Sequence, residues 1–457
     1  MRTFTRTALI FLLAGLGYLS AGEKLTVPYS RFTLPNGLTV IVHEDHTVPR
    51  VSVNIWYHVG SGSEKVGRTG FAHLFEHILF EGSGHVPEGK FDQWLEAAGA
   101  NNNGSTTNDR TNYYEDLPSN ALELALFLES DRMGYLLDAM SPEKVDGQRD
   151  VVKNEKRQRV DNQPYGRAWE ILAKNIYPAE HPYSWSVIGS MEDLSAASYQ
   201  DVVDFFNSYY TPSNAALVVA GDVKTEEVRK LTEKWFSDVP GRAPAPPVDP
   251  VPAVLQEEKS IVLEDKVQLP RLYMTWLSPA RFQPGDAEFD LLTTILTEGK
   301  NSRLYKRLVY ELQIAQSVVA YNDSKKLSGE FYIIATARAG HNLSELKDVI
   351  QQELDKLKQE PPTERELQRA LNQYEADFYR KLERAGGFNG KANQLNTYYY
   401  YTGNPDYFNE DLARYQAVSP GDLSAIASTY LKDDARVILS IVPVGKTELA
   451  AAKGGAK

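Results

Sequence analysis

The stretch "TGFAHLFEHILFEGSG" (69–84) decides how the rest of the sequence is interpreted. Its apolar residues recur at helical spacing, so we expect a helix over 69–81. Residues four apart on a helix lie one turn apart on the same face, which places His73 and His77 together with Glu76 beside them. The stretch is therefore either an ordinary amphipathic helix with polar residues or a metal site built on one.

Two imidazole nitrogens so placed can bind one zinc ion at about 2.0–2.1 Å. Glu76 can then take a proton from a water molecule that the zinc activates, as the general base for attack on a carbonyl. The order His-x-x-Glu-His is the inverted form of the commoner zinc-peptidase motif. A catalytic zinc site also needs a third protein ligand, and no histidine lies conveniently near, so an acidic residue elsewhere is implied. The alternative is a buried helix whose histidines bond to backbone carbonyls.

Composition excludes several classes of function. The chain has 457 residues and a net charge of -12, so it offers no basic patch for nucleic acid. It contains no cysteine, which excludes disulfides, thiolate metal sites and a cysteine nucleophile. The remaining histidines we interpret as structural or solvated: His43, His46, His58, His85, His181 and His341.

The first 22 residues are typical of a signal peptide. Arg2 and Arg6 precede the apolar run 8–19, and small residues follow it. The run is short for a membrane span, and no other candidate span follows in the mature chain. We expect export, to a bacterial periplasm; a mitochondrial transit peptide is the alternative.

Beyond the signal peptide, irregularly ordered strand and helix patterns predict an α+β fold with mainly antiparallel sheets flanked by helices. Alternating residues predict strands within 32–62, and 214–223 is typical of a buried strand. Helical periodicity fills 121–137 and 142–176. The predicted divisions are an N-terminal zinc-binding domain (23–240), a linker with five prolines in its first part (241–258), a C-terminal domain (259–445) and a flexible tail (446–457).

An internal repeat indicates that the two domains are homologous. The segment "PRVSVNIWY" (49–57) matches "PRLYMTWL" (270–277), and "HLFEHILFEG" (73–82) matches "DLLTTILTEG" (290–299) in its apolar frame. Only the polar positions differ, and their second-half counterparts are Asp290, Thr293 and Thr294. This pattern predicts a duplicated scaffold with chemistry in its first half.

The mature chain resembles the inverted-motif zinc peptidase family of pitrilysin, insulysin and mitochondrial processing peptidase. The segments that carry the resemblance are "LPNGLTVIV", "GFAHLFEHILFEGS", "GANNNGSTTNDRTNYYEDLP", "RDVVKNEKRQRVDNQPYG", "HPYSWSVIGSMEDL", "TPSNAALVVAGDV" and "GKNSRLYKRL". It implies one zinc ion bound by His73, His77 and Glu155, with Glu76 as base. The family often has a glutamate seven residues before the last ligand, which supports the site, whereas this chain has Gln148 there.

The resemblance also implies that Asn103 and Gly104 lie on an edge strand that binds substrate. A peptide adds to such a strand through main-chain hydrogen bonds, which favours broad specificity for extended or unfolded peptides. The alternative for this segment is a polar loop.

One departure from the family predicts a partner. Single-chain and homodimeric members carry an arginine and a tyrosine seven residues apart in the second half, which bind substrate and stabilise the oxyanion. At those positions this chain has Val309 and Gln316. We therefore expect a homologous partner chain without zinc that supplies both groups; the alternative is a misalignment, with Arg303 or Tyr321 in those roles.

The sequence thus predicts a zinc metalloendopeptidase subunit that hydrolyses short or unfolded peptides. Two alternatives stay open. One is a non-catalytic scaffold subunit of the same fold, and the other is a peptidase dedicated to processing one precursor.

Overall fold

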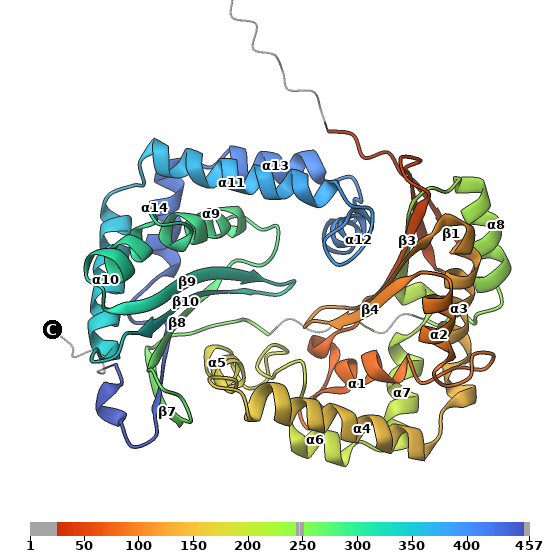
Figure 1. Cartoon of the computed structure of the whole chain (residues 1–457), viewed down its shortest axis with the longest axis horizontal. Helices are drawn as coiled ribbons and strands as arrows, with labels where there is room; N and C mark the ends of the chain where they lie inside the picture. The colour runs from red at the N-terminus through yellow and green to blue at the C-terminus, as the bar shows by residue number, and fades with distance from the viewer. Residues whose placement is uncertain (1–24, 244–245, 247–250, 452–457) are drawn as a thin grey trace, which may run out of the picture.

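The computed structural model describes residues 25–243, 246 and 251–451. The predicted signal peptide (1–22) lies outside them, as does much of the proline-rich part of the linker. The α+β prediction is confirmed: two mixed, mainly antiparallel sheets stand side by side, each flanked by helices (Figure 1).

The first sheet has six strands. In spatial order they are β1 (Ser30–Thr33), β2 (Thr39–Glu44), β6 (Ala215–Gly221), β3 (Arg50–Tyr57), β5 (Thr111–Pro118) and β4 (Asn101–Thr106). Only β2 and β6 pair in parallel, with Ile41 opposite Val218. The central strands β3 and β6 are buried almost throughout, as their runs of β-branched and apolar residues predict.

The second sheet repeats this arrangement without a counterpart of β1. Its order is β7 (Lys259–Asp265), β11 (Val437–Pro443), β8 (Arg271–Ser278), β10 (Gly329–Ala337) and β9 (Ala315–Ser324). The one parallel pair, β7 with β11, occupies the place of β2 with β6. The repeat seen in the sequence is thus a repeat of topology, in which β9 corresponds to the edge strand β4.

Helices cover both sheets. Those of the first half are α1 (Phe71–Ile78), α2 (Lys90–Ala97), α3 (Leu122–Tyr135), α4 (Pro142–Lys156), α5 (Ala168–Ile176), α6 (Met191–Ala196), α7 (Tyr199–Tyr209) and α8 (Thr225–Phe236). Those of the second half are α9 (Asp286–Thr297), α10 (Leu343–Gln359), α11 (Glu364–Leu382), α12 (Lys391–Thr402), α13 (Phe408–Gln416) and α14 (Pro420–Tyr430). None of the helices in the described ranges is long and apolar enough to cross a membrane.

Each half contributes one helix that packs on the sheet of the other half. Helix α12 of the second half packs on β3 and β6 of the first sheet, while α5 of the first half packs on β8 and β11 of the second. Each contact is an apolar cluster in its own right, centred on Leu395 and Tyr398 in one case and on Leu172 and Ile176 in the other. Because burial of such clusters stabilises association, the halves form one continuous structure rather than two bodies joined only by a linker.

A buried carboxylate joins the hairpin tips of the two halves. Asp109, in the turn between β4 and β5, accepts hydrogen bonds from the Tyr401 hydroxyl and the Lys326 backbone N–H, both at 2.9 Å. The Tyr183 hydroxyl also donates to Asp109 and in turn accepts from the Leu327 N–H at 3.1 Å. The turn after β4 is thereby fixed against the turn between β9 and β10.

Two sequence predictions need correction. The helix predicted over 142–176 is interrupted after a π-helical turn, Arg157–Asp161, because Pro164 and Gly166 follow before α5 begins. The tail predicted as flexible over 446–457 is ordered at Ala451, which is buried and whose N–H donates to the Ser440 hydroxyl at 3.0 Å. Residues 452–457 lie outside the described part of the chain.

Candidate metal centre

Helix α1 begins at a backbone position that suits glycine. Its N-cap, Gly70, has φ 90°, in the left-handed region, and offers no side chain to cap the helix. The buried Glu64 carboxylate does this instead, accepting hydrogen bonds from the N–H groups of Gly70 at 3.0 Å and Ala72 at 2.8 Å. Sequence reasoning missed Glu64, because nothing in the spacing of a glutamate six residues upstream indicates a cap.

Burial of one face of α1 directs the other face toward α4. Leu74, Phe75 and Ile78 are wholly buried in the core, whereas His73 and His77 are partly exposed. Their ring centroids lie 4.9 Å apart, at 76° to each other. The amphipathic helix predicted from the sequence is therefore present, with both histidines on its polar face.

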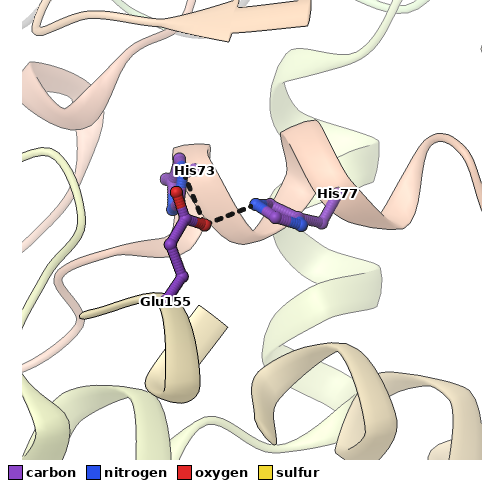
Figure 2. Close-up of side chains that lie close together, drawn as sticks. All are labelled: His73, His77 and Glu155. Atoms are coloured by element: carbon purple, nitrogen blue, oxygen red, sulfur yellow. Dashed lines mark ion pairs between the residues drawn. The ribbon is translucent and has the colours of Figure 1, made fainter. Parts of the chain in front are cut away.

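Glu155 of α4 completes a three-residue group. Its Oε2 atom lies 3.1 Å from His77 Nε2 and 3.7 Å from His73 Nε2 (Figure 2). One ligand atom from each residue lies within 4.8 Å of the others. Among the described residues, this is the one group of three or more histidine, cysteine or acidic side chains with such spacing.

The geometry of this group fits zinc. Two ligand atoms each about 2.05 Å from a tetrahedral zinc ion lie about 3.3 Å from each other. The distances of 3.1 and 3.7 Å to the Glu155 oxygen bracket that value. The donor set is two neutral nitrogens and one carboxylate, with a position left for water, as in catalytic zinc sites.

The charges of the site suit metal binding. Burial, followed by the nearby His77, lowers the pKa of His73 from 6.5 to about 4, so its ring is neutral and able to bind a metal near neutral pH. The three side chains keep 13%, 26% and 15% of their surface exposed, which leaves the site accessible. Arg159 Nη1 contacts the other carboxylate oxygen, Glu155 Oε1, at 2.6 Å, so the carboxylate also has a cationic partner.

Glu76 lies beside the group. In the described part of the chain, no hydrogen bond or ion pair joins its side chain to His73, His77 or Glu155. Its carboxylate Oε2 accepts a hydrogen bond from the Thr106 hydroxyl of β4 at 2.5 Å. Burial raises the pKa of Glu76 above its usual value, while the Thr106 bond and His77 act in the opposite direction. A raised pKa makes the carboxylate a better proton acceptor near neutral pH.

Gln148 does not reach the ligands. Its side-chain amide donates to Glu81 Oε1 at 2.7 Å instead. The position that carries a supporting glutamate in the family is thus occupied here by a glutamine that bonds to Glu81, three residues after the end of α1.

The segment with Asn103 and Gly104 is a strand, so the polar-loop alternative is wrong. β4 pairs with β5 on one side and lies at the edge of the sheet. On its free side, the Gly104 N–H bonds at 2.8 Å to the side-chain oxygen of the preceding Asn103. A main-chain donor at the edge is therefore held by a side chain that can rotate away.

Neither Arg303 nor Tyr321, the candidate replacements for the missing arginine and tyrosine, is free of partners in the described second half. Val309 packs against the core, and Gln316 is exposed on β9. Arg303 forms a two-pronged ion pair with Glu366, at 2.7 and 3.0 Å. The Tyr321 ring stacks on Tyr332, with centroids 4.7 Å apart.

Comparison with known proteins agrees with this geometry. Residues 39–183 match the model for the insulinase family, peptidase family M16, and residues 196–374 match the model for the peptidase M16 inactive domain. The zinc protease PqqE of Helicobacter pylori is 29% identical over 439 residues, covering 94% of this chain and 97% of that protein. A probable mitochondrial-processing peptidase subunit beta of Arabidopsis thaliana is 24% identical, covering 93% and 80%.

A solved structure shares the fold over nearly the whole chain. The crystal structure of a protease from Helicobacter pylori matches with a TM-score of 0.85 and 27% identity, covering 91% of this chain and 99% of that one. The two family models together span most of both halves, and the His-His-Glu group lies within the first. The chain belongs to the peptidase M16 (insulinase) family.

Proposed function

We propose that the chain is a zinc metalloendopeptidase subunit that hydrolyses extended or unfolded peptides. The observation that carries this proposal is the convergence of His73, His77 and Glu155, from two helices, on a volume that suits one zinc ion. Its supports are the zinc protease relatives and the position of Glu76 one residue before His77.

In this proposal each residue has one task. His73, His77 and Glu155 would hold the zinc, which would supply a positive charge to polarise water and the peptide carbonyl. Glu76 accepts the proton of the attacking water at its carboxylate and passes it to the leaving amine. The raised pKa of Glu76 suits the first step, because a higher pKa makes its carboxylate a stronger proton acceptor.

The substrate is proposed to dock on the free edge of β4. A peptide there would replace the Asn103 side chain as partner of the Gly104 N–H and add a strand to the sheet. Main-chain pairing selects for extended backbone rather than for particular side chains, so we infer broad specificity.

We further propose that a homologous chain without the zinc residues completes the site. The support is the state of the four candidate residues: Val309 is half-buried against the core, Gln316 is uncharged, Arg303 is paired with Glu366 and Tyr321 is stacked. A heterodimer would then supply the groups that stabilise the developing oxyanion.

Two rival functions make different predictions. A non-catalytic scaffold subunit would bind no zinc and would show no peptide hydrolysis with any partner. A dedicated processing peptidase would leave most of a mixed peptide library uncut, whereas a broad peptidase would cut many of its members.

Export is proposed on sequence grounds. The basic residues Arg2 and Arg6 before the apolar run 8–19, together with the absence of cysteine, suit a periplasmic protein. Fractionation of cells that express the full chain tests this, because a mature form starting near Gly22 should appear outside the cytoplasm.

The deciding experiment is hydrolysis of a quenched fluorescent peptide by the zinc-loaded chain and by Glu76→Gln at equal zinc content. Loss of the base should lower the rate by a factor of about 100 or more. Glu88→Gln is a matched control, since this exposed glutamate between α1 and α2 pairs with Lys144 and is not a member of the His-His-Glu group. Equal rates for the chain and Glu76→Gln would refute the proposed role; weak hydrolysis by the chain alone that rises with a homologous chain would support the heterodimer.

A further inference from the structure

A hydroxyl of the proposed substrate strand bonds directly to the proposed base. Thr106, the last residue of β4, donates its hydroxyl hydrogen to Glu76 Oε2 across 2.5 Å. Both side chains are only partly exposed, and Glu76 makes no other side-chain hydrogen bond in the described structure. The one described hydrogen bond to this carboxylate thus comes from a neutral donor.

The same strand also gives the Glu76 side chain its space. Residues two apart on a strand face the same side, so Gly104 and Thr106 both face α1. A Cβ atom on Gly104 would lie 3.1 Å from Glu76 Cγ, and also 3.1 Å from the Tyr113 ring. The stem of Glu76 therefore lies against bare backbone at Gly104, and its carboxylate reaches Thr106 one step along the strand.

The donor is itself well fixed. Thr106 pairs with Thr111 of β5, and the Thr107 N–H that follows it bonds to the Arg110 carbonyl at 2.9 Å. Arg110 in turn donates to the Ser105 carbonyl at 2.8 Å. Because the end of the hairpin is also anchored through Asp109, the Thr106 hydroxyl has a defined place relative to α1.

We propose that Thr106 is a positioning residue, which holds the Glu76 carboxylate in its working orientation through this hydrogen bond. The inference rests on the proposed function of Glu76 as base, and it adds a residue to which no role had been assigned. A misplacement of about 1 Å in a reacting group can lower a rate by about 100-fold, so one orienting bond has a measurable effect.

This arrangement makes β4 serve two purposes. Its free edge at Gly104 is the proposed place of the peptide, and its α1-facing side holds the base. A peptide that pairs with β4 would therefore be positioned by the same strand that positions Glu76. The strand thus fixes where the substrate lies relative to the base.

The test compares Thr106→Val, which keeps the shape but removes the hydroxyl, with Thr106→Ser, which keeps the hydroxyl. Crystal structures of the zinc-loaded variants should show Glu76 in one conformer bonded to residue 106 in the parent chain and in Thr106→Ser. In Thr106→Val the carboxylate should adopt another conformer or several. An unchanged Glu76 conformer in Thr106→Val would overturn the proposal.

Kinetics supply the second readout. In the preparation that cleaves peptide, Thr106→Val should lower kcat about 10-fold with KM changed by less than about 2-fold, and Thr106→Ser should recover most of the loss. Thr111→Val is the matched control: it faces Thr106 across the hairpin and loses a bond to the Val59 carbonyl, yet it should keep kcat. Equal loss of kcat in Thr111→Val, or no recovery in Thr106→Ser, would contradict positioning.

Failure of the proposed function has a different signature. If the zinc-loaded parent chain shows no hydrolysis that depends on Glu76, with or without a partner, the role of Glu76 as base is wrong. The crystal structures still decide whether Thr106 orients Glu76, because they do not depend on turnover.

Discussion

Both halves of the molecule contain the same pair of packed helices, but the polar side chains between the two helices differ. In the first half, α1 and α4 bring together His73, His77 and Glu155, whose ligand atoms lie within 4.8 Å of one another and whose side chains stay partly exposed. In the second half, α9 and α11 line part of a cavity of about 280 Å³, in which Asp290 is bonded to Tyr415 of the same half.

Asp290, the counterpart of His73, illustrates the difference. Its carboxylate accepts hydrogen bonds from the Tyr415 hydroxyl at 2.6 Å and from the Asn322 amide at 3.2 Å. Thr293 and Thr294, at the places of Glu76 and His77, donate to the Asp290 carbonyl and to Glu298. A duplicated scaffold can thus keep its packing while one copy uses its polar positions for internal bonds and the other keeps them for a ligand.

The largest expected effect is on zinc binding in the first half. Glu155→Gln replaces a charged ligand by a neutral amide, so we expect zinc affinity to fall by a factor of about 100 or more. Isothermal titration calorimetry with zinc measures the affinity. Glu143→Gln, an exposed glutamate at the start of the same helix, should bind zinc as the parent chain does. Unchanged affinity in Glu155→Gln would remove the distinction between the two halves.

A substitution at the corresponding helix of the second half should change the stability of the protein rather than its metal binding. Asp290→Asn leaves the Tyr415 hydroxyl or the Asn322 amide without an acceptor, so we expect a loss of about 1–3 kcal/mol in the free energy of unfolding. Denaturation with urea measures it, and Asp348→Asn on the exposed face of α10 should change stability by less than about 0.5 kcal/mol. Zinc affinity should stay the same; a loss of zinc on Asp290→Asn would show that the halves are not separate in function.

The smallest effect is a pair of opposite pH dependences. Burial lowers the pKa of His58, at the end of β3, from 6.5 to about 4. Between these values the unfolded chain binds more protons, so His58 makes the folded state less stable as pH falls from about 6.5 to 4. Burial raises the pKa of Asp290 from 3.8 to about 6, so Asp290 makes the folded state less stable as pH rises through that range.

Unfolding free energies of the metal-free chain at several pH values separate the two. Relative to the parent chain, His58→Asn should flatten the fall in stability toward acid, and Asp290→Asn should flatten the opposing trend. Parallel pH profiles for all three proteins would contradict these assignments.

Much of the first half could be predicted from the sequence because its signals are local. Helix α1, the strands around it and the places of His73 and His77 follow from periodicity and motif spacing. Glu155 came only from the family resemblance, since an acid some 80 residues away has no local signature. The break before α5 could have been predicted from Pro164 and Gly166. The helical periodicity on either side of them favoured one continuous helix instead.

Contacts between distant segments could not be predicted. The exchange of α5 and α12 between the two sheets depends on how the halves pack, which the amphipathic pattern of either helix leaves open. The Thr106–Glu76 bond joins a strand to a helix 30 residues earlier, and a threonine in a polar strand gives no indication of its partner. The Glu64 cap of α1 is missed for the same reason.

The most direct test of the account is anomalous X-ray diffraction at the zinc absorption edge from crystals of the zinc-loaded chain. The account predicts one strong peak per chain, within about 2.0–2.2 Å of His73 Nε2, His77 Nε2 and a Glu155 oxygen, and none between α9 and α11. A peak at the second helix pair, or none at the first in a chain that retains zinc in solution, would contradict it.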